Sequence, residues 1–468
     1  LDALASLADK SLLVAADRGS TVRYSLLQTI RQYAAERLQG DELKAALQRH
    51  ARHYVDQVVA IRSRFDTAGH AAAEAELALE HEQARAALEA ACTHQWLDVA
   101  LPMAEALAWY WYQAGPLADG MARVARVLAL EPPPSAETAL LLRRGAALAI
   151  RCGRLDTARG WLESGLAMAR ADGAVSTVGG ILNTLGNLGY TQGRFEVARE
   201  HYSEALAIFR DSGLRENEVS TTSNLAGIER RLGRLDASRE HYRRALALLQ
   251  GSSNGRRIGH LKLNLGELEA VSGRADVALP LLRESIEALQ PYGEDWGIGL
   301  ARMVLGGCAL AVSDLARARE ETVAGLALLR RDGDPGSMAH ALDQLARIAS
   351  RERRADEAGA HAAEALTLRL QARNLPDIAS SLNTWAALIA DAHAEHAARL
   401  LGCADAVREA EHAPLDPPLQ IEEQQLLARL AETLGAERLS AARAAGAADD
   451  PLVLGAALVG DAAATIPR

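Results

Sequence analysis

Aromatic residues, cysteines and long apolar runs are all scarce in this 468-residue sequence. Phenylalanine, tyrosine and tryptophan together form 4% of it, while alanine, leucine and arginine dominate, which favours helices over sheets. The four cysteines lie far apart without paired spacing, so neither a disulfide framework nor a zinc cluster is indicated, and a reducing cytoplasm fits best. No apolar run approaches about 18 residues, so we expect no membrane partner.

Charge and length set further limits. The chain has 51 basic and 61 acidic residues and a net charge of −10, which argues against a protein whose main partner is nucleic acid or anionic lipid. An apolar fraction of 49% with 24% charged residues is typical of a protein that forms a core. Because the sequence begins at Leu1 and shows no signal peptide, we expect a piece of a longer protein.

A turn pattern recurs at intervals of 40 residues. Gly-Arg followed by an apolar residue and then an acidic residue begins at Gly153, Gly193, Gly233 and Gly273. A small residue stands five positions after each of these glycines, and the same 40-residue step continues it to residue 398. The column consists of Ala158, Ala198, Ser238, Ala278, Ala318, Ala358 and Ala398. A fixed period without insertions indicates an internal repeat.

Each 40-residue unit has helical spacing on both sides of its turn. Small and apolar residues at positions 182, 185, 186 and 189 precede the turn at Gly193, and those at 198, 202, 205 and 209 follow it. We therefore predict a helix, a turn at a left-handed glycine and a second helix, with Ala198 at the close approach of the two helices. Such pairs bury their apolar faces by stacking on their neighbours.

The repeat resembles the tetratricopeptide repeat, whose Leu-Gly, Gly, Ala, aromatic and Ala positions correspond here to Leu185-Gly186, Gly193, Ala198, Tyr202 and Ala205. The resemblance implies an all-α, right-handed superhelical solenoid with a concave groove. Two features depart from the pattern. The period is 40 rather than about 34 residues, and Gly189 stands where the repeat usually has an aromatic residue.

Four regions follow from the patterns. Residues 1–38 predict a helix at 1–9, a hairpin with strands at 11–14 and 21–26 around Asp17-Arg18-Gly19, and a helix at 27–38, as in the second half of a winged helix. Residues 39–131 predict a helical connector with a degenerate helix pair at Trp109–Tyr112, Gly115 and Gly120. The regular array occupies 135–412, and prolines then introduce capping helices and a tail at 413–468, with a helix at 419–435 and an alanine-rich end from about 440 that we expect to fray.

A second resemblance covers nearly the whole chain. The segments at 7–13, 24–34, 80–88 and 398–402 are similar to the STAND-type regulators, from Leu-Ala-Asp-Lys-Ser-Leu-Leu at the first to Ala-Arg-Leu-Leu-Gly at the last. The resemblance implies that a nucleotide-binding domain of the same chain precedes Leu1 and that the winged-helix remnant packs on it. The three lysines, Lys10, Lys44 and Lys262, do not follow glycine, so no P-loop and no cofactor are expected in this fragment. The net charge of +1 over residues 1–38 predicts no direct nucleic-acid contact.

Catalytic and metal motifs are weak. Residues 251–255, Gly-Ser-Ser-Asn-Gly, match the G-x-S-x-G motif of hydrolases, but no strand precedes them, so we interpret them as a loop between repeats. Residues 297–299, Gly-Ile-Gly, lack the third glycine of a dinucleotide motif and are also predicted to form a loop. The histidines at 201, 241 and 361 share one column and those at 393 and 396 share one helix face, but neither set closes a metal site. We predict no catalytic, cofactor-binding or metal residue.

The predicted binding groove lies on the face of each first helix that does not pack. Gly180, Asn183, Asn187, Tyr190 and Thr191 define its five columns. Shifts of 40 residues add Arg143, Arg151, Ser223, Arg230, Arg231, His260, Glu267, His340, Asp343, Arg347 and Arg351. Arginine occupies these columns at about twice its density in the chain, which indicates an acidic peptide or anionic ligand. Alternatively, Arg151, Arg230 and Arg231 serve the dipole of the helix that ends beside them.

These features favour a non-catalytic sensory and protein-interaction region of a STAND-type transcriptional or signalling regulator, which binds a peptide, protein or small effector on its repeats. A free-standing tetratricopeptide adaptor or scaffold is the first alternative. An enzyme whose site has no recognisable motif is the second.

We predict that this chain alone neither hydrolyses nor tightly binds ATP, because the Gly-Lys-Ser/Thr loop that cradles phosphates is missing. Calorimetry and a phosphate-release assay check this prediction. Turnover, or tight nucleotide binding, would contradict it.

Overall fold

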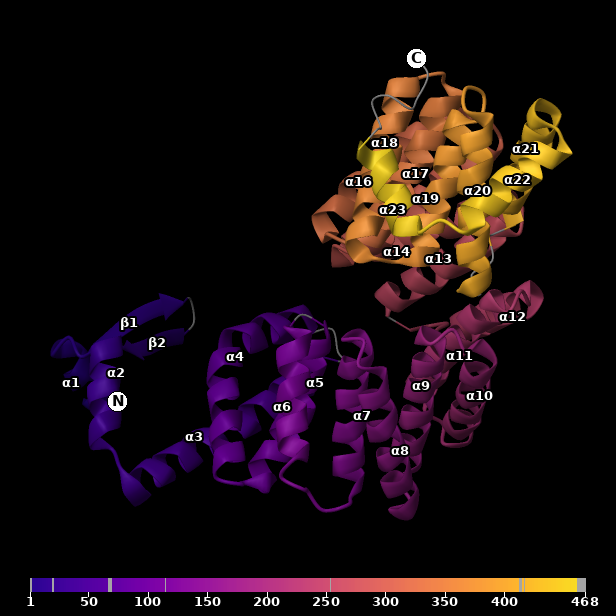
Figure 1. Ribbon diagram of the computed structural model, residues 1–468. Helices are drawn as coiled ribbons and strands as arrows, with labels where there is room; N and C mark the ends of the chain where they lie inside the picture. Colours follow the sequence, from indigo (N-terminus) through magenta and orange to yellow (C-terminus); the bar gives the residue numbers. More distant parts are fainter. Residues whose placement is uncertain are drawn as a thin grey trace. The chain divides into compact units, whose positions relative to one another are not determined.

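Helix pairs joined by short turns follow one another along the chain in the computed structural model, which describes residues 2–18, 21–65, 70–113, 115–252, 254–411, 415 and 417–460 (Figure 1). The predicted all-α repeat fold is confirmed. The chain forms two units, Leu1–Leu188 and Gly189–Arg468. Within the described residues, no helix combines the length and the apolar character that a bilayer crossing requires.

The N-terminal elements follow the predicted order of helix, hairpin and helix. They are α1 (Asp2–Asp9), β1 (Leu13–Arg18), β2 (Thr21–Leu26) and α2 (Gln28–Arg37). The predicted bounds of the first strand were wrong, because the register pairs Leu13 with Leu26 and Arg18 with Thr21, so that every residue from 13 to 18 has a partner. Gly19, the predicted turn residue, lies outside the described residues.

The rest of the first unit is helical and includes the predicted degenerate pair. Its helices are α3 (Gly40–Arg62), α4 (His70–Thr93), α5 (Leu97–Gln113), α6 (Leu117–Leu128), α7 (Ala136–Arg151) and α8 (Leu155–Ala171). In α5 the ring of Trp111 is fully buried, and a Cβ at Gly120 would lie 2.6 Å from it, which explains the glycine. The Trp111 Nε1 donates a hydrogen bond of 2.9 Å to Nε2 of His81, and burial lowers the pKa of that histidine.

The regular array continues through both units in 40-residue steps. Its helices are α9 (Val175–Thr191), α10 (Phe195–Asp211), α11 (Arg215–Arg231), α12 (Leu235–Leu248), α13 (Gly255–Val271), α14 (Ala275–Leu289), the short η1 (Gln290–Tyr292), α15 (Asp295–Ala311), α16 (Leu315–Asp332), α17 (Pro335–Arg351), α18 (Ala355–Ala372), α19 (Leu375–Ile389) and α20 (Ala394–Ala410). The turn residue keeps a left-handed conformation, with φ of 69° at Gly193 and still 61° at Ser313 and 59° at Arg353, where glycine has been lost. The turn therefore keeps its left-handed conformation in repeats where another residue replaces the glycine that favours it.

The small-residue column lies where the two helices of each pair meet. All seven of its members, from Ala158 to Ala398, are at most 1% exposed. A Cβ added at Gly189 of α9 would lie 3.2 Å from the Cβ of Ala198 in α10. This confirms the predicted close approach, because a larger side chain at either position would push the helices apart.

The predicted loop at residues 297–299 was wrong, since they lie inside α15. A Cβ at Gly297 would come within 2.7 Å of Leu289, and one at Gly299 within 2.9 Å of Leu329. These glycines therefore let α15 approach the second helices of two pairs. Their spacing reflects packing and not a turn.

Three helices cap the array: α21 (Pro417–Leu434), α22 (Ala436–Ala447) and α23 (Pro451–Gly460). The predicted helix at 419–435 is confirmed. The expected fraying from residue 440 was wrong as far as residue 460, and 461–468 lie outside the described residues. A Cβ at Gly402 of α20 would overlap the backbone of Arg443, and one at Gly446 of α22 would overlap that of Arg399. Two glycines therefore allow α20 and α22 to cross in backbone contact.

We expect Gly446→Ala to destabilise the protein by about 1–3 kcal/mol, because the added methyl forces α20 and α22 apart. Gly160→Ala is the matched control. Gly160 also lies inside a helix, but a Cβ there meets nothing within 4 Å, so the better helix former should add about 0.5–1 kcal/mol. Urea unfolding of both variants checks the pair, and equal changes of the same sign would show that the crossing is not a constraint.

Candidate functional site

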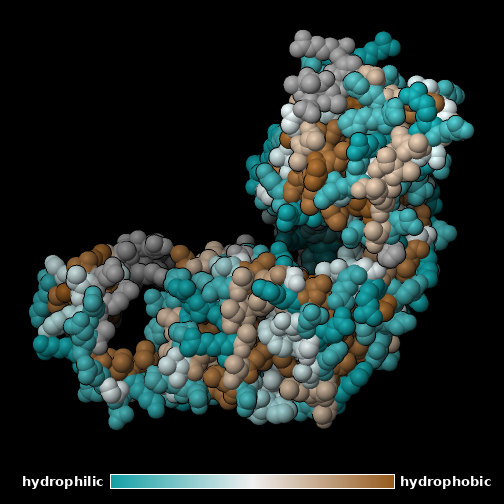
Figure 2. All heavy atoms as spheres, in the orientation of Figure 1, coloured by the Kyte–Doolittle hydropathy of each residue, from teal (hydrophilic) through white to brown (hydrophobic). Residues whose placement is uncertain are grey.

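The five predicted groove columns lie on the first helix of each pair. Such helices from neighbouring pairs contact one another, as α5 and α7 do in the first unit and α13, α15, α17 and α19 do in the second. Second helices of neighbouring pairs scarcely touch. The stack is therefore tighter along these first helices than along the second helices, and the placement of the five groove columns on a concave surface stays a prediction. On the visible face, hydrophilic residues predominate and apolar residues form smaller patches between them (Figure 2).

Arg143 of α7 is a cation without a counter-ion. It makes no hydrogen bond or ion pair with the described residues, and its Nε is buried without a partner. Burial, with a contribution from Arg144, lowers its pKa to about 9, so the group stays charged at neutral pH. Glu105 opposes this shift, but it already accepts a hydrogen bond of 3.0 Å from Nε of Arg144. Gly180 leaves room for the side chain, since a Cβ there would lie 3.2 Å from Cδ of Arg143.

Arg151, Arg231 and Arg351 share one column and connect neighbouring repeats. Each reaches back to the end of the first helix in the preceding repeat. Arg151 donates to the carbonyl of Tyr112 at 2.6 Å, and Arg351 donates to that of Leu310 at 2.8 Å.

Arg231 donates to the hydroxyl of Tyr190 at 3.2 Å and lies 5.9 Å from its ring centroid. Neither sequence interpretation, ligand binding or the helix dipole, predicted these contacts. The arginines bind the end of the first helix in the preceding repeat, as well as lying at the end of their own helix.

The middle of the second unit balances its groove charges internally. Arg230 forms an ion pair of 2.9 Å with Glu267, so two predicted groove residues neutralise each other. His260 lies 3.6 Å from Glu294, which also contacts Arg256. These partners, mainly the hydrogen bond from His260, hold the pKa of the Glu294 carboxyl below its usual range. A continuous basic stripe is therefore absent from this part of the described chain.

His340 of α17 is exposed. Half of its side chain is accessible to solvent, and it lies 3.9 Å from Asp377. Burial among surrounding protein nevertheless lowers its pKa, with a further contribution from Arg369. Glu267, two repeats earlier, is close enough to oppose that shift.

The placement of Asp343 on the open face was wrong. Asp343 turns into the repeat and pairs with Arg369 of α18, which is 2% exposed and also donates to Ser381 at 2.6 Å. The column of Arg369 otherwise holds buried apolar residues: Ala169, Phe209, Leu249, Leu289 and Leu329. An arginine in such a column needs a buried acid, and this was the signal that would have placed Asp343 inside.

Arg347 and Arg351 contact the capping helix α21. Arg347 pairs with Glu422, and Arg351 lies 3.3 Å from the same carboxylate. The next carboxylate, Glu423, accepts a hydrogen bond of 2.6 Å from Nδ2 of Asn383, which is in the column of Asn183. Three predicted groove columns therefore meet two adjacent acidic side chains of the same chain.

Glu423 also contacts Arg408 of α20 at 2.8 Å. We call Arg347, Arg351, Asn383 and Arg408 the arginine site. The remaining predicted groove residues, Asn183 and Asn187, are partly buried in α9 and have partners.

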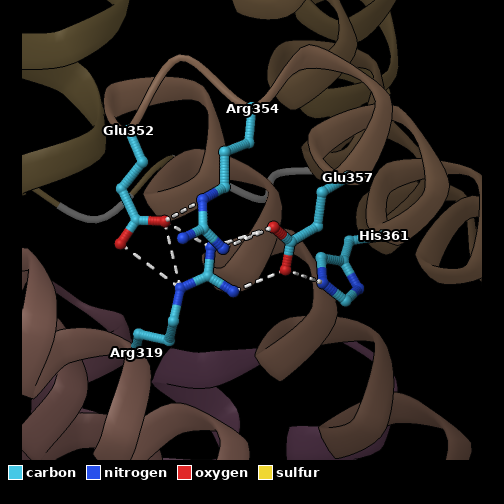
Figure 3. Close-up of polar contacts among 5 residues, drawn as sticks. All are labelled: Arg319, Glu352, Arg354, Glu357 and His361. Atoms are coloured by element: carbon cyan, nitrogen blue, oxygen red, sulfur yellow. Dashed lines mark hydrogen bonds and ion pairs between the residues drawn. The ribbon is translucent and has the colours of Figure 1, made fainter.

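A second column of arginines, which the sequence interpretation missed, forms ion pairs away from the groove. Figure 3 shows Arg319 of α16 between Glu352 and Glu357, each 2.5 Å away, with Arg354 and His361 completing the cluster. The two carboxylates raise the pKa of Arg319. The signal was periodic, because Arg199, Arg239 and Arg319 share one column. The cluster gives His361 a carboxylate neighbour, and no group of three metal-ligating side chains occurs among the described residues.

The serine motif forms the loop before α13, as predicted. Asn254 caps this helix by accepting a hydrogen bond of 3.1 Å from the backbone N–H of Arg257. Ser253 lies outside the described residues.

Known proteins share the repeat and the fold. Residues 178–251 and 217–290 match the family model of the tetratricopeptide repeat, a repeat of protein-interaction regions. The array is a tetratricopeptide-like solenoid. Over 124 residues, the chain is 36% identical to HTH-type transcriptional regulators of Mycobacterium tuberculosis and Mycobacterium bovis, and the match spans 26% of this chain and 14% of theirs.

Two solved structures resemble the solenoid at 14% identity, which shows the fold. A Rap protein complexed with competence and sporulation factor has a TM-score of 0.52, over 77% of this chain and 99% of that chain. A signal transduction ATPase with numerous domains and a tetratricopeptide repeat sensor, from Pyrococcus horikoshii, has a TM-score of 0.51, over 94% of this chain and 60% of that chain.

We predict that Arg369→Met destabilises the protein by about 3–5 kcal/mol, because it leaves Asp343 buried without its partner. The double variant Arg369→Met with Asp343→Leu should regain most of that loss, since two apolar side chains replace the pair. Thermal and urea unfolding check both proteins. Equal losses of stability in the single and the double variant would show that an unpaired carboxylate at Asp343 is not the cause of the destabilisation.

Proposed function

We propose that this chain is the non-catalytic sensory and protein-interaction region of a STAND-type, ATPase-coupled transcriptional or signalling regulator. In this proposal a peptide or protein segment that carries carboxylates binds to the concave face of the first helices. A nucleotide-binding domain upstream of Leu1 in the same chain would convert that binding into a response.

The observation that carries the proposal is Arg143. Arg143 is partly buried, its Nε fully so, and a charged group withdrawn from water without an ion pair lowers the stability of a fold. Its column belongs to the predicted concave side, where an anionic group from outside the chain would supply the missing partner. The arginines at 151, 231 and 351 already have partners within the chain. An external anionic ligand would therefore add the most stabilisation at Arg143.

The similar proteins support a regulatory role. The Rap structure holds a bound factor, the Pyrococcus protein carries a tetratricopeptide sensor beside an ATPase, and the mycobacterial relatives are HTH-type regulators. The helix–hairpin–helix order of residues 2–37 is also what the second half of a winged helix requires, and the resemblance to STAND regulators implies such a module before the sensor.

The coding sequence upstream of Leu1 tests the regulator part. We expect a G-x-x-x-x-G-K-S/T motif within the preceding few hundred residues. Its absence from the complete gene would contradict the STAND assignment and favour the free-standing adaptor.

Arg143→Met tests the binding part in the full-length protein. We expect the melting temperature to stay equal or rise, because a partly buried charge without an ion pair is removed, while the partner purified with the parent protein is lost. Arg49→Met is the matched control, since Arg49 is exposed in the same unit and makes no hydrogen bond or ion pair with the described residues. Lower stability of Arg143→Met with an unchanged partner would show that Arg143 is structural.

A further inference from the structure

The capping helix α21 occupies the arginine site as a ligand would. Its adjacent carboxylates, Glu422 and Glu423, lie on side chains from three first-helix columns of α17 and α19 and on Arg408 of α20. The partners are 15 to 75 residues apart in sequence, from Arg408 and Glu423 to Arg347 and Glu422. The contact is therefore a tertiary docking of one helix on the face where ligands are expected to bind.

The two halves of α21 are held in different ways. Leu426 and Leu430, in the second half, are 4% and 1% exposed and belong to the apolar core of the cap. In the first half Ile421 is 57% exposed and Leu419 is partly buried, and Glu422 and Glu423 make the polar contacts. Apolar contacts thus hold the second half and ion pairs latch the first, so a helix that replaces all of α21 must displace both sets of contacts.

The latch is the weaker attachment. The side chains of Arg347 and Glu422 are 26% and 37% exposed, and partly exposed ion pairs contribute little each and are screened by salt. Glu423 and Arg408 are less exposed, at 15% and 10%, but Arg408 keeps Asp405 as a second acidic partner. Its charge would therefore stay paired if Glu423 left.

We propose that the arginine site binds an acidic helix of a partner protein and that α21 is the tethered occupant with which this helix exchanges. The partner helix would present two adjacent carboxylates followed by leucines three or four and seven or eight positions later. That spacing, shown by Glu422, Glu423, Leu426 and Leu430 in α21, puts all four side chains on one helix face. The inference rests on the proposed function and names its partner class and its regulation, because the partner must displace α21.

The chemistry favours a helix over a free anion. Arg347 and Arg351 converge on one carboxylate, while Asn383 and Arg408 receive the next. Two carboxylates one residue apart on a rigid backbone satisfy both pairs together. The apolar contacts of Leu426 and Leu430 add a surface that a small anion lacks.

The test uses a fluorescent peptide of residues 417–434, PPLQIEEQQLLARLAETL, as the probe of acidic-helix binding. Its affinity is measured by anisotropy with the full chain and with the double variant Glu422→Gln and Glu423→Gln, which loosens the latch at constant size. We expect the double variant to bind the peptide at least about tenfold more tightly than the parent. Glu432→Gln is the matched control, since Glu432 is exposed on the same helix without a hydrogen bond or ion pair to the described residues, and it should bind as the parent does.

The site itself is tested by adding Arg347→Gln and Arg351→Gln to the loosened variant. We expect peptide binding to fall to the parent level or below, and a peptide with glutamine at 422 and 423 to bind the loosened variant weakly. Melting curves verify that each protein is folded. Equal peptide affinity in the parent and the loosened variant, or binding that ignores the two arginines, would overturn the proposal.

A change in oligomeric state distinguishes one further outcome. If the loosened variant forms dimers in sedimentation experiments and binds no peptide, a second copy of this chain is the occupant and the proposal of a partner protein is wrong. Failure of the proposed function is distinguishable from all these results, because it is tested through Arg143 in the first unit and involves neither α21 nor the arginine site.

Discussion

The close approach of two helices at a buried small residue, repeated every 40 residues, is the constraint on which the rest of the structure depends. At Ala198 the two helices leave room for only a small side chain, and a buried small residue stands at the equivalent position of every unit from residue 158 to 398. This spacing keeps each pair the same width, so neighbouring pairs stack in one register. The register in turn aligns the exposed positions of the first helices into columns.

The same constraint shows what the sequence predicts well. Period and helical spacing indicated the pairs, and the left-handed turn remains at Ser313 and Arg353 although glycine is gone. Local patterns are readable because each depends on residues close in sequence. The prediction for residues 297–299 was wrong because their glycines make room for residues distant in sequence, Leu289 and Leu329 of other helices.

Features that depend on distant partners were not predictable in the same way. Asp343 belongs to the interior because Arg369, 26 residues later, interrupts an apolar column, and Arg347 meets Glu422 across 75 residues. The cap at 436–460 shows the same limit. Its alanine-rich sequence has little pattern of its own, and the crossing at Gly402 and Gly446 fixes where α22 packs. The groove columns were defined by sequence, but which of their charges are already paired is a property of the fold.

Most charged side chains in the groove columns are already paired within the chain. Arginines at 151, 231 and 351 join repeats, and Arg230 is neutralised by Glu267. Arg143 and the arginine site differ, the first because it lacks a counter-ion and the second because its counter-ions come from a helix with a weakly held end. The face of the groove columns is thus a largely satisfied surface with two places where an external acidic group changes the balance of charge.

Native-state hydrogen exchange on the full chain tests most directly whether α21 is a detachable occupant. The account predicts that amides of residues 421–429 open with a lower free energy than those of α20, and that replacing Glu422 and Glu423 by glutamine lowers this opening energy while α20 is unchanged. If α21 opens only together with α20 in global unfolding, with or without the two carboxylates, it is a permanent cap and the account is contradicted.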